Sequence, residues 1–349
     1  MRLARFGPGL VVILVACTSV RPGPLGEGSG DDGPDAASGV PDAGVDASPA
    51  EPRPKGDRTL GIVVRPDDLG FVEQVEAIRD AGAGSTNVAF AWDEVEQPAD
   101  GADGGTTVFY HPFVHVAGLV LSSAGVSADA ALVAVDGAGA RLPADLAGRS
   151  LDDAEVAARY AAATDYVLEQ LGDATVSVFL VGEGVDRAFG DDAARYDAFA
   201  VFVQRAAAHV HATSSRAIRV AFTVSAEGLG ARAALLEGAL AASDLVAVDH
   251  VGGAPLDLDA LAAAAPAGRP VVVHAAGYPS APDADAQVAF VRSTFQAWDR
   301  HADRIPRLTF FELDDPPEGA TTFGLRRGGT GATKPAFGVL RSNARARGF

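Results

Sequence analysis

The sequence predicts an α/β protein of the (β/α)8 TIM barrel class, preceded by a signal peptide and a disordered linker. After residue 58, short β-branched runs alternate with Ala-rich amphipathic stretches, which is the pattern of βαβ units and a parallel sheet. Eight such pairs fit a barrel, whose usual size is roughly 250 residues plus insertions. A doubly wound open sheet is the alternative, and the absence of a G-x-G-x-x-G turn after the first strand weakens it.

The N-terminal residues follow the order of an export signal. Arg2 and Arg5 precede an apolar run from Leu10 to Ala16, and small residues then lead to Cys17. This run is too short to cross a bilayer, which needs about 20 apolar residues. We therefore assign residues 1–16 to a signal peptide and exclude them from the fold.

The tetrapeptide Leu14, Val15, Ala16 and Cys17 resembles the lipobox of bacterial lipoproteins, in which the cysteine is lipidated and begins the mature chain. The resemblance implies an exported protein, lipid-anchored in the bacterial cell envelope, with the membrane as a partner through Cys17. It would lie in the outer membrane or face the periplasm. The alternative is a secreted protein cut near Ala16. Because Cys17 is the only cysteine, an intrachain disulfide is excluded.

Residues 17–57 are rich in Gly, Pro, Ala, Ser and Asp and nearly lack large apolar side chains. Burial of such a segment cannot offset the entropy lost on ordering it, so we expect a disordered tether. The third predicted unit is the barrel, residues 58–349.

The predicted strands of the barrel are β-branched or aromatic runs that end in polar or small residues. They cover 60–64, 85–92, 129–135, 175–182, 218–224, 244–250, 270–275 and 307–313. The predicted helices have apolar residues three and four apart. They cover 68–81, about 110–124, 151–171, 193–213, 229–241, 257–265, 284–302 and 334–345.

The charge of the chain excludes one class of partner. The formal net charge is −18, and no basic stripe interleaved with aromatic residues is present. We therefore expect no binding to nucleic acid, because such binding depends on cations that meet the phosphate backbone.

Five segments at the predicted strand ends and C-terminus together resemble the clan A glycoside hydrolases. In that family the fourth strand ends in Gly-Asn-Glu, the seventh in Glu-x-Gly-Tyr-Pro-Ser, and a Gly-rich turn then precedes Lys-Pro-Ala. The matching segments are "NVAFAWDEVEQPADG" (87–101), "ALVAVDGAGARLPADL" (131–146), "VFLVGEGVDRAFG" (178–190), "RPVVVHAAGYPSAPD" (269–283) and "FGLRRGGTGATKPAFGVL" (323–340).

Both catalytic positions implied by the resemblance are replaced. The family's retaining mechanism needs a carboxyl that protonates the leaving oxygen and a second that attacks the anomeric carbon. The alignment puts Glu183 at the asparagine, Gly184 at the acid/base glutamate and Ala275 at the nucleophile. Neither glycine nor alanine can do this chemistry. We therefore expect a catalytically degenerate barrel.

Displaced acids are the alternative. Glu183 and Glu312 are the candidate catalytic pair, although strand alternation predicts that Glu183 points away from the side that Gly184 faces. A bulge at the strand end would reverse that direction. Two carboxyls about 6.5–9.5 Å apart would permit an inverting mechanism. His274, His250, Asp249 and Glu312 have the types of metal ligands but not a ligand spacing, so we expect no metal and no cofactor.

The remaining strand-end residues suit a carbohydrate ligand. Aromatic faces can stack on a pyranose ring, and carboxylates or imidazoles can bind its hydroxyls. We expect a carbohydrate-binding or structural surface protein, with an active glycoside hydrolase as the alternative. The expected substrate-binding residues are Trp92, Asp136, Asp186, Asp249, His250, His274 and Tyr278.

Overall fold

The computed structural model describes residues 51–65, 70–98, 107–316, 322–328 and 330–349. The predicted signal peptide, Cys17 and most of the predicted tether lie outside these residues. In the described part, nine parallel strands form one sheet in the order β10-β11-β12-β13-β1-β2-β5-β8-β9. The strands are β1 (Thr59–Ile62), β2 (Ser85–Ala91), β5 (Ser127–Val133), β8 (Val176–Leu180), β9 (Arg219–Ala221), β10 (Thr223–Ser225), β11 (Val246–Val251), β12 (Val271–Gly277) and β13 (Arg307–Phe310).

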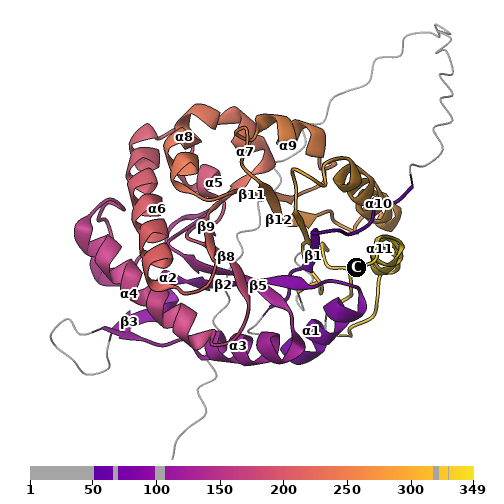
Figure 1. Ribbon diagram of the computed structural model, residues 1–349, viewed down its shortest axis with the longest axis horizontal. Coiled ribbons are helices and arrows are strands. Elements are labelled where there is room, and N and C mark those ends of the chain that lie inside the picture. The colour runs from indigo at the N-terminus through magenta and orange to yellow at the C-terminus, as the bar shows by residue number, and fades with distance from the viewer. Residues whose placement is uncertain (1–50, 66–69, 99–106, 317–321, 329) are drawn as a thin grey trace, which may run out of the picture. The chain divides into compact units, whose positions relative to one another are not determined.

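The sheet closes on itself at the fifth strand position. Only Phe222 separates β9 from β10, and the Thr223 amide donates a 2.9 Å hydrogen bond to the carbonyl of Gly182, just beyond β8. Because β9 and β10 share one position, the nine strands fill eight positions around a ring, with the helices outside it (Figure 1). The predicted (β/α)8 barrel is confirmed.

The outer helices agree closely with the predicted ranges. They are α1 (Phe71–Asp80), α3 (Pro112–Ala124), α4 (Ala154–Gln170), α6 (Ala193–Thr213), α8 (Ala233–Ala242), α9 (Leu258–Ala264), α10 (Ala284–Arg300) and α11 (Pro335–Arg347). Four of them begin at an aspartate whose side chain accepts backbone N–H groups that the first turn leaves unpaired. These caps are Asp153, Asp192, Asp257 and Asp283.

Short elements after the strands shape the carboxyl end of the barrel. The helices among them are α2 (Trp92–Val95), α5 (Val185–Phe189), α7 (Ala226–Ala231) and the 3-10 turn Ala144–Leu146. Two hairpins pair β3 (Glu96–Pro98) with β4 (Thr107–Phe109) and β6 (Val135–Asp136) with β7 (Gly139–Ala140). The predicted helix 229–241 is in fact α7 and α8, which meet at Arg232.

Two apolar layers hold the barrel together. The larger layer lies between the sheet and the helices and includes Val246 and Val248 of β11. Ala247, between them, belongs to the smaller layer inside the ring. This alternation is the period of two that a strand imposes. The inner layer is made of small side chains that fit the narrow interior, namely Ala131, Val133, Val178, Leu180, Ala221, Leu245, Ala247 and Val272.

The last residues of the predicted tether lie against the barrel. The Lys55 amide donates to the Arg347 carbonyl over 2.7 Å, and Arg53 pairs with Asp303 at 2.6 Å. The guanidinium of Arg58 lies over the Trp298 ring, 4.6 Å from its centroid. Residues 51–57 therefore contact the folded domain, because the Arg53 side chain and the Lys55 amide both find partners near its C-terminal helices.

Candidate functional site

A break in strand alternation turns Glu183 into the mouth of the barrel. Leu180 belongs to the inner apolar layer and Val181 to the outer one. Gly182 also faces outward, since a Cβ there would lie 3.4 Å from the Phe199 ring of α6. Two successive outward residues return Glu183 to the inside. The prediction that Glu183 points away from the mouth is therefore wrong, and the extra residue at Gly182 is the reason.

Four strands, β2, β10, β11 and β12, bring a buried polar network to the same place. Thr223 Oγ1 donates to Asp249 Oδ2 and accepts from the Gly184 amide over 2.9 Å. The other carboxylate oxygen of Asp249 lies 3.0 Å from His274 Nδ1. Asn87 Nδ2 donates to the His274 carbonyl over 2.7 Å. Both oxygens of Asp249 are thus occupied, and its role is to fix the imidazole.

Glu183 lies close enough to His274 for their charges to act on each other. His274 Nε2 is buried and has no hydrogen-bond partner within the described ranges. Burial lowers the pKa of His274, but the hydrogen bond and charge of Asp249, together with the charge of Glu183, raise it above its usual value. Burial raises the pKa of Glu183, and the opposing influence of His274 is smaller. The two groups therefore interact electrostatically, and each favours the charged form of the other.

The position matched to the family nucleophile carries only a methyl group. Val248 pairs with Val273, and the next residue, Asp249, pairs with Ala275, so β12 holds one extra residue at His274. Residues paired across parallel strands face the same side, so Ala275 faces the mouth beside Asp249. Ala275 is buried and supplies no oxygen.

Glu312 lies elsewhere in the mouth. Three strand positions separate β13 from β8 in either direction around the ring. Glu312 is buried and pairs with Arg65 at 2.5 Å. Burial raises the pKa of Glu312, and Arg65 only partly opposes this. The charges that act on Glu312 are Arg65, Asp314 and Asp315, whereas those acting on Glu183 include His274 and Asp249. The two members of the predicted catalytic pair thus have different partners, Arg65 for Glu312 and His274 for Glu183.

Two predicted ligand residues serve the core instead. Trp92 is fully buried, packs edge-on against Tyr160 and donates its indole N–H to Glu96 over 2.9 Å. Its role in sugar stacking is a wrong prediction, because the turn of α2 carries the ring under the hairpin rather than over the mouth. Asp186 is 1% exposed and accepts from the Ser225 amide at 2.8 Å and its hydroxyl at 2.6 Å. Both carboxylate oxygens of Asp186 therefore hold the chain at Ser225 in place.

Three other predicted ligands lie at the rim or outside it. His250 stacks on Phe290 of α10 and bonds to the Ala254 carbonyl over 2.9 Å, so the alternation of β11 puts it outside the ring. The prediction for His250 is wrong. Asp136 is partly exposed and accepts two amides of its own hairpin turn. Tyr278 is half-buried at the rim, where its ring packs 5.5 Å from Phe290.

The network contains residues that sequence reasoning missed. Thr223, Asn87 and Arg65 each anchor a predicted site residue. Thr223 and Asn87 had one available signal, since each is a polar residue within an otherwise apolar strand.

Among the residues that the structure describes, no group of three or more His, Cys, Asp or Glu side chains is arranged to hold a metal ion. In the same residues, no helix is long and apolar enough to cross a membrane.

Comparison with known proteins identifies the fold. No protein-family model matches the chain, and no curated protein matches it. Among solved structures, GH5_18 from Bifidobacterium longum subsp. longum matches with a TM-score of 0.65 at 13% identity, over 83% of this chain and 79% of that one. A variant of that protein was solved in complex with Manβ1-4GlcNAc.

Two further structures give the same result. The exo-β-1,4-mannosidase Op5Man5 from Opitutaceae bacterium strain TAV5 matches with a TM-score of 0.67 at 13% identity, over 83% of this chain and 59% of that one. The GH53 catalytic domain from Ignisphaera aggregans matches with a TM-score of 0.61 at 14% identity, over 83% of this chain and 98% of that one. The chain therefore shares the (β/α)8 barrel fold of these glycoside hydrolases.

Proposed function

We propose that the mouth of this barrel binds a carbohydrate and does not cleave it by double displacement. One observation carries the proposal: the seventh strand presents Ala275 where an attacking carboxylate is needed, and both oxygens of Asp249, which pairs with Ala275 on the next strand, are occupied. Double displacement needs two free carboxyls about 5–5.5 Å apart. Glu183 alone supplies one.

Three features support binding. Ala89 of β2 is exposed although its neighbours Val88 and Phe90 face the outer layer, so the inner wall of the mouth is open to solvent beside it. The carboxyl of Glu183 and the Nε2 of His274 provide polar groups for sugar hydroxyls. Tyr278 stands at the rim with an aromatic face. The GH5_18 neighbour, which binds Manβ1-4GlcNAc, makes a mannose-containing glycan the first ligand to test.

Hydrolysis is the second candidate, and a specific observation favours it. The raised pKa of Glu183 lets its carboxyl keep a proton to higher pH than an ordinary glutamate, as a general acid requires. An inverting reaction would then need Asp249 to give up a hydrogen bond and activate a water molecule.

One experiment separates the two candidates. A chain beginning at Pro49 is tested against a glycan panel that includes Manβ1-4GlcNAc, with binding and reducing-sugar release measured in parallel. We expect binding without release. Release that Glu183→Gln abolishes would establish the hydrolase instead. The control is Glu227→Gln, which removes an exposed carboxyl after the fifth strand. Absence of both binding and release would reject both candidates.

We also propose that the protein is exported and anchored through a lipid on Cys17, which lies outside the described residues. Support comes from the order of the N-terminal sequence alone. Metabolic labelling with a fatty acid tests this proposal. The label should enter the wild-type chain and be lost in Cys17→Ser, and labelling of both chains or of neither would contradict it.

A further inference from the structure

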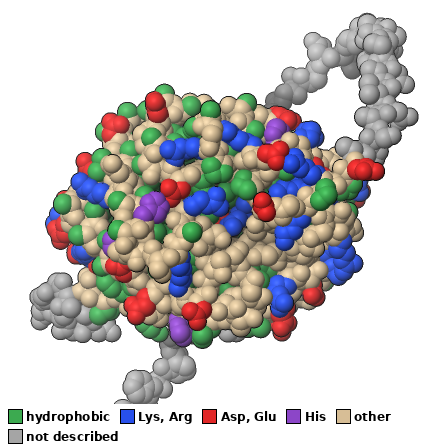
Figure 2. All heavy atoms as spheres, in the orientation of Figure 1, with side chains coloured by type: hydrophobic (Ala, Val, Ile, Leu, Met, Phe, Trp, Pro, Cys, Tyr) green, Lys and Arg blue, Asp and Glu red, His purple; other side chains and the backbone are tan. Residues whose placement is uncertain are grey.

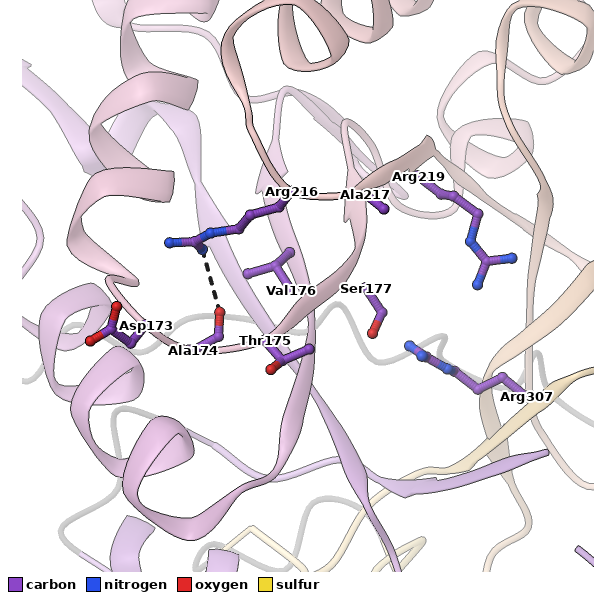
Figure 3. Close-up of a pocket in the computed structure, with 9 residues that line it drawn as sticks. All are labelled: Asp173, Ala174, Thr175, Val176, Ser177, Arg216, Ala217, Arg219 and Arg307. Atoms are coloured by element: carbon purple, nitrogen blue, oxygen red, sulfur yellow. Dashed lines mark hydrogen bonds between the residues drawn. The ribbon is translucent and has the colours of Figure 1, made fainter. Parts of the chain in front are cut away.

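A second hollow lies at the amino ends of the barrel strands, opposite the mouth. Its volume is about 430 Å³, which is within the usual range of small-ligand sites. Ser177 of β8, Arg219 of β9 and Arg307 of β13 come from the first residues of their strands (Figure 3). The other lining residues are Asp173, Ala174, Thr175, Val176, Arg216 and Ala217. No residue of the mouth takes part, so this hollow is independent of the proposed carbohydrate site.

The hollow carries a positive charge without a protein partner. Arg307 is bonded to Asp129, and Arg216 donates to the carbonyls of Ala174 and Gly172. Arg219 is partly buried, yet within the described ranges its guanidinium makes no hydrogen bond or ion pair. Three guanidinium groups therefore face two carboxylates, those of Asp129 and Asp173, which leaves one cation in excess. The face drawn in Figure 2 also shows several Lys and Arg side chains near its middle, although the chain as a whole is acidic.

A strand irregularity adds a hydroxyl to this charge. Ala128 pairs with Val176 and Asp129 with Val178, so Ser177 is an extra residue in β8. In Figure 3 the Ser177 side chain points toward the guanidinium of Arg307, and the guanidinium of Arg219 turns to the same side of the hollow. The Ser177 hydroxyl has no hydrogen-bond partner in the described part of the chain. Two planar N–H donor groups and a hydroxyl donor suit the oxygens of a tetrahedral anion.

We propose that this hollow binds a phosphate or sulfate group through Arg219, Arg307 and Ser177. The anion lies between the guanidinium groups of Arg219 and Arg307 and relieves the repulsion between them. It also accepts a hydrogen bond from the Ser177 hydroxyl. Arg219 supplies the unpaired charge, while Arg307 is held in place by Asp129. The open side of the hollow admits either a free ion or a phosphate group at the end of a larger ligand.

Titration calorimetry on the full chain tests the proposal with inorganic phosphate, with sulfate, and with chloride at matched ionic strength. We expect saturable binding of phosphate or sulfate and none of chloride. Arg219→Gln should weaken it about 10-fold or more, because it removes a charged hydrogen-bond donor. Ser177→Ala should weaken it by a smaller factor.

The matched control is Arg79→Gln, which removes the same charge from an exposed position on α1 and should leave binding unchanged. Circular dichroism checks that each variant folds. Two results would overturn the proposal: absence of saturable binding by the wild-type chain, or equal binding by Arg219→Gln and Arg79→Gln. If Arg219→Gln does not fold, Ser177→Ala decides, and full affinity in that variant overturns the site.

Discussion

Trp92 offers the sharpest test of whether an aromatic residue beside the mouth serves the core or the ligand. Replacing Trp92 with phenylalanine keeps an aromatic ring but removes the indole N–H that donates to Glu96. A hydrogen bond to a charged group contributes about 1.5–3 kcal/mol. The smaller ring also leaves a cavity against Tyr160, at a cost below the 3–5 kcal/mol typical of truncation to alanine. We expect the free energy of unfolding to fall by about 2–4 kcal/mol.

Urea unfolding followed by circular dichroism measures this loss, because tryptophan fluorescence changes with the substitution itself. The control is Trp298→Phe, which alters an equally buried indole that donates to the Ile305 carbonyl at 2.7 Å. Both variants should lose stability, and neither should change glycan affinity. A loss below about 1 kcal/mol in Trp92→Phe, combined with a 10-fold weaker glycan affinity, would refute the argument that the ring is structural.

Three further predictions concern the residues that shape the mouth. Gly184→Ala should lower the free energy of unfolding by about 1–2 kcal/mol, since Gly184 has a φ of +60°, whereas Gly230→Ala, with open space around it, should cause no loss. Lys334→Met should cost about 1–3 kcal/mol, because the half-buried Asp315 loses its cation and keeps only the Gly324 amide as a partner, and adding Asp315→Asn should recover part of this loss in urea unfolding. Burial lowers the pKa of His274, but Asp249 and Glu183 more than offset this, so the pKa is higher in the folded protein than in the unfolded chain. The protonated imidazole therefore stabilises the fold fully below about pH 6.5, and this stabilisation is lost as the pH rises through the pKa of the folded state. The difference in urea midpoint between wild type and His274→Gln should therefore shrink from about pH 6 to pH 8, and a pH-independent difference would contradict this.

The fold could be predicted because the signals are local and repeat. The amphipathic pattern over residues 193–213 gives helix α6 with the same bounds, since its apolar face and the Asp192 cap both act within the segment. The structure departs from the predicted elements where contacts between distant parts of the chain determine the local conformation. The fifth strand is interrupted at Phe222, whose ring packs against Phe199 of α6. The hairpins after β2 and β5 are too short to show a period.

The site could be predicted only in part. Strand ends place Asp249, His274 and Glu312 at the carboxyl end of the barrel, and the structure finds them there. The direction of a side chain at a strand end depends on irregularities that no local pattern reveals. His250 lies outside the ring and Glu183 inside it for this reason. The aromatic ring of Trp92 at the end of a predicted strand indicates a surface for sugar stacking. However, α2 begins at that residue and buries the ring.

Two single-residue irregularities determine the chemistry that the mouth can support. The one at Gly182 turns a carboxyl inward, and the one at His274 turns a methyl group inward beside Asp249. Proton transfer from Glu183 needs a second group to attack the sugar, and Asp249 can do so only by releasing Thr223 or His274. Either release leaves a buried polar group without its partner, which costs about 1–3 kcal/mol before any chemistry begins. A ligand that accepts a hydrogen bond from His274 and donates one to Glu183 meets no such cost, which supports the proposal of binding without cleavage.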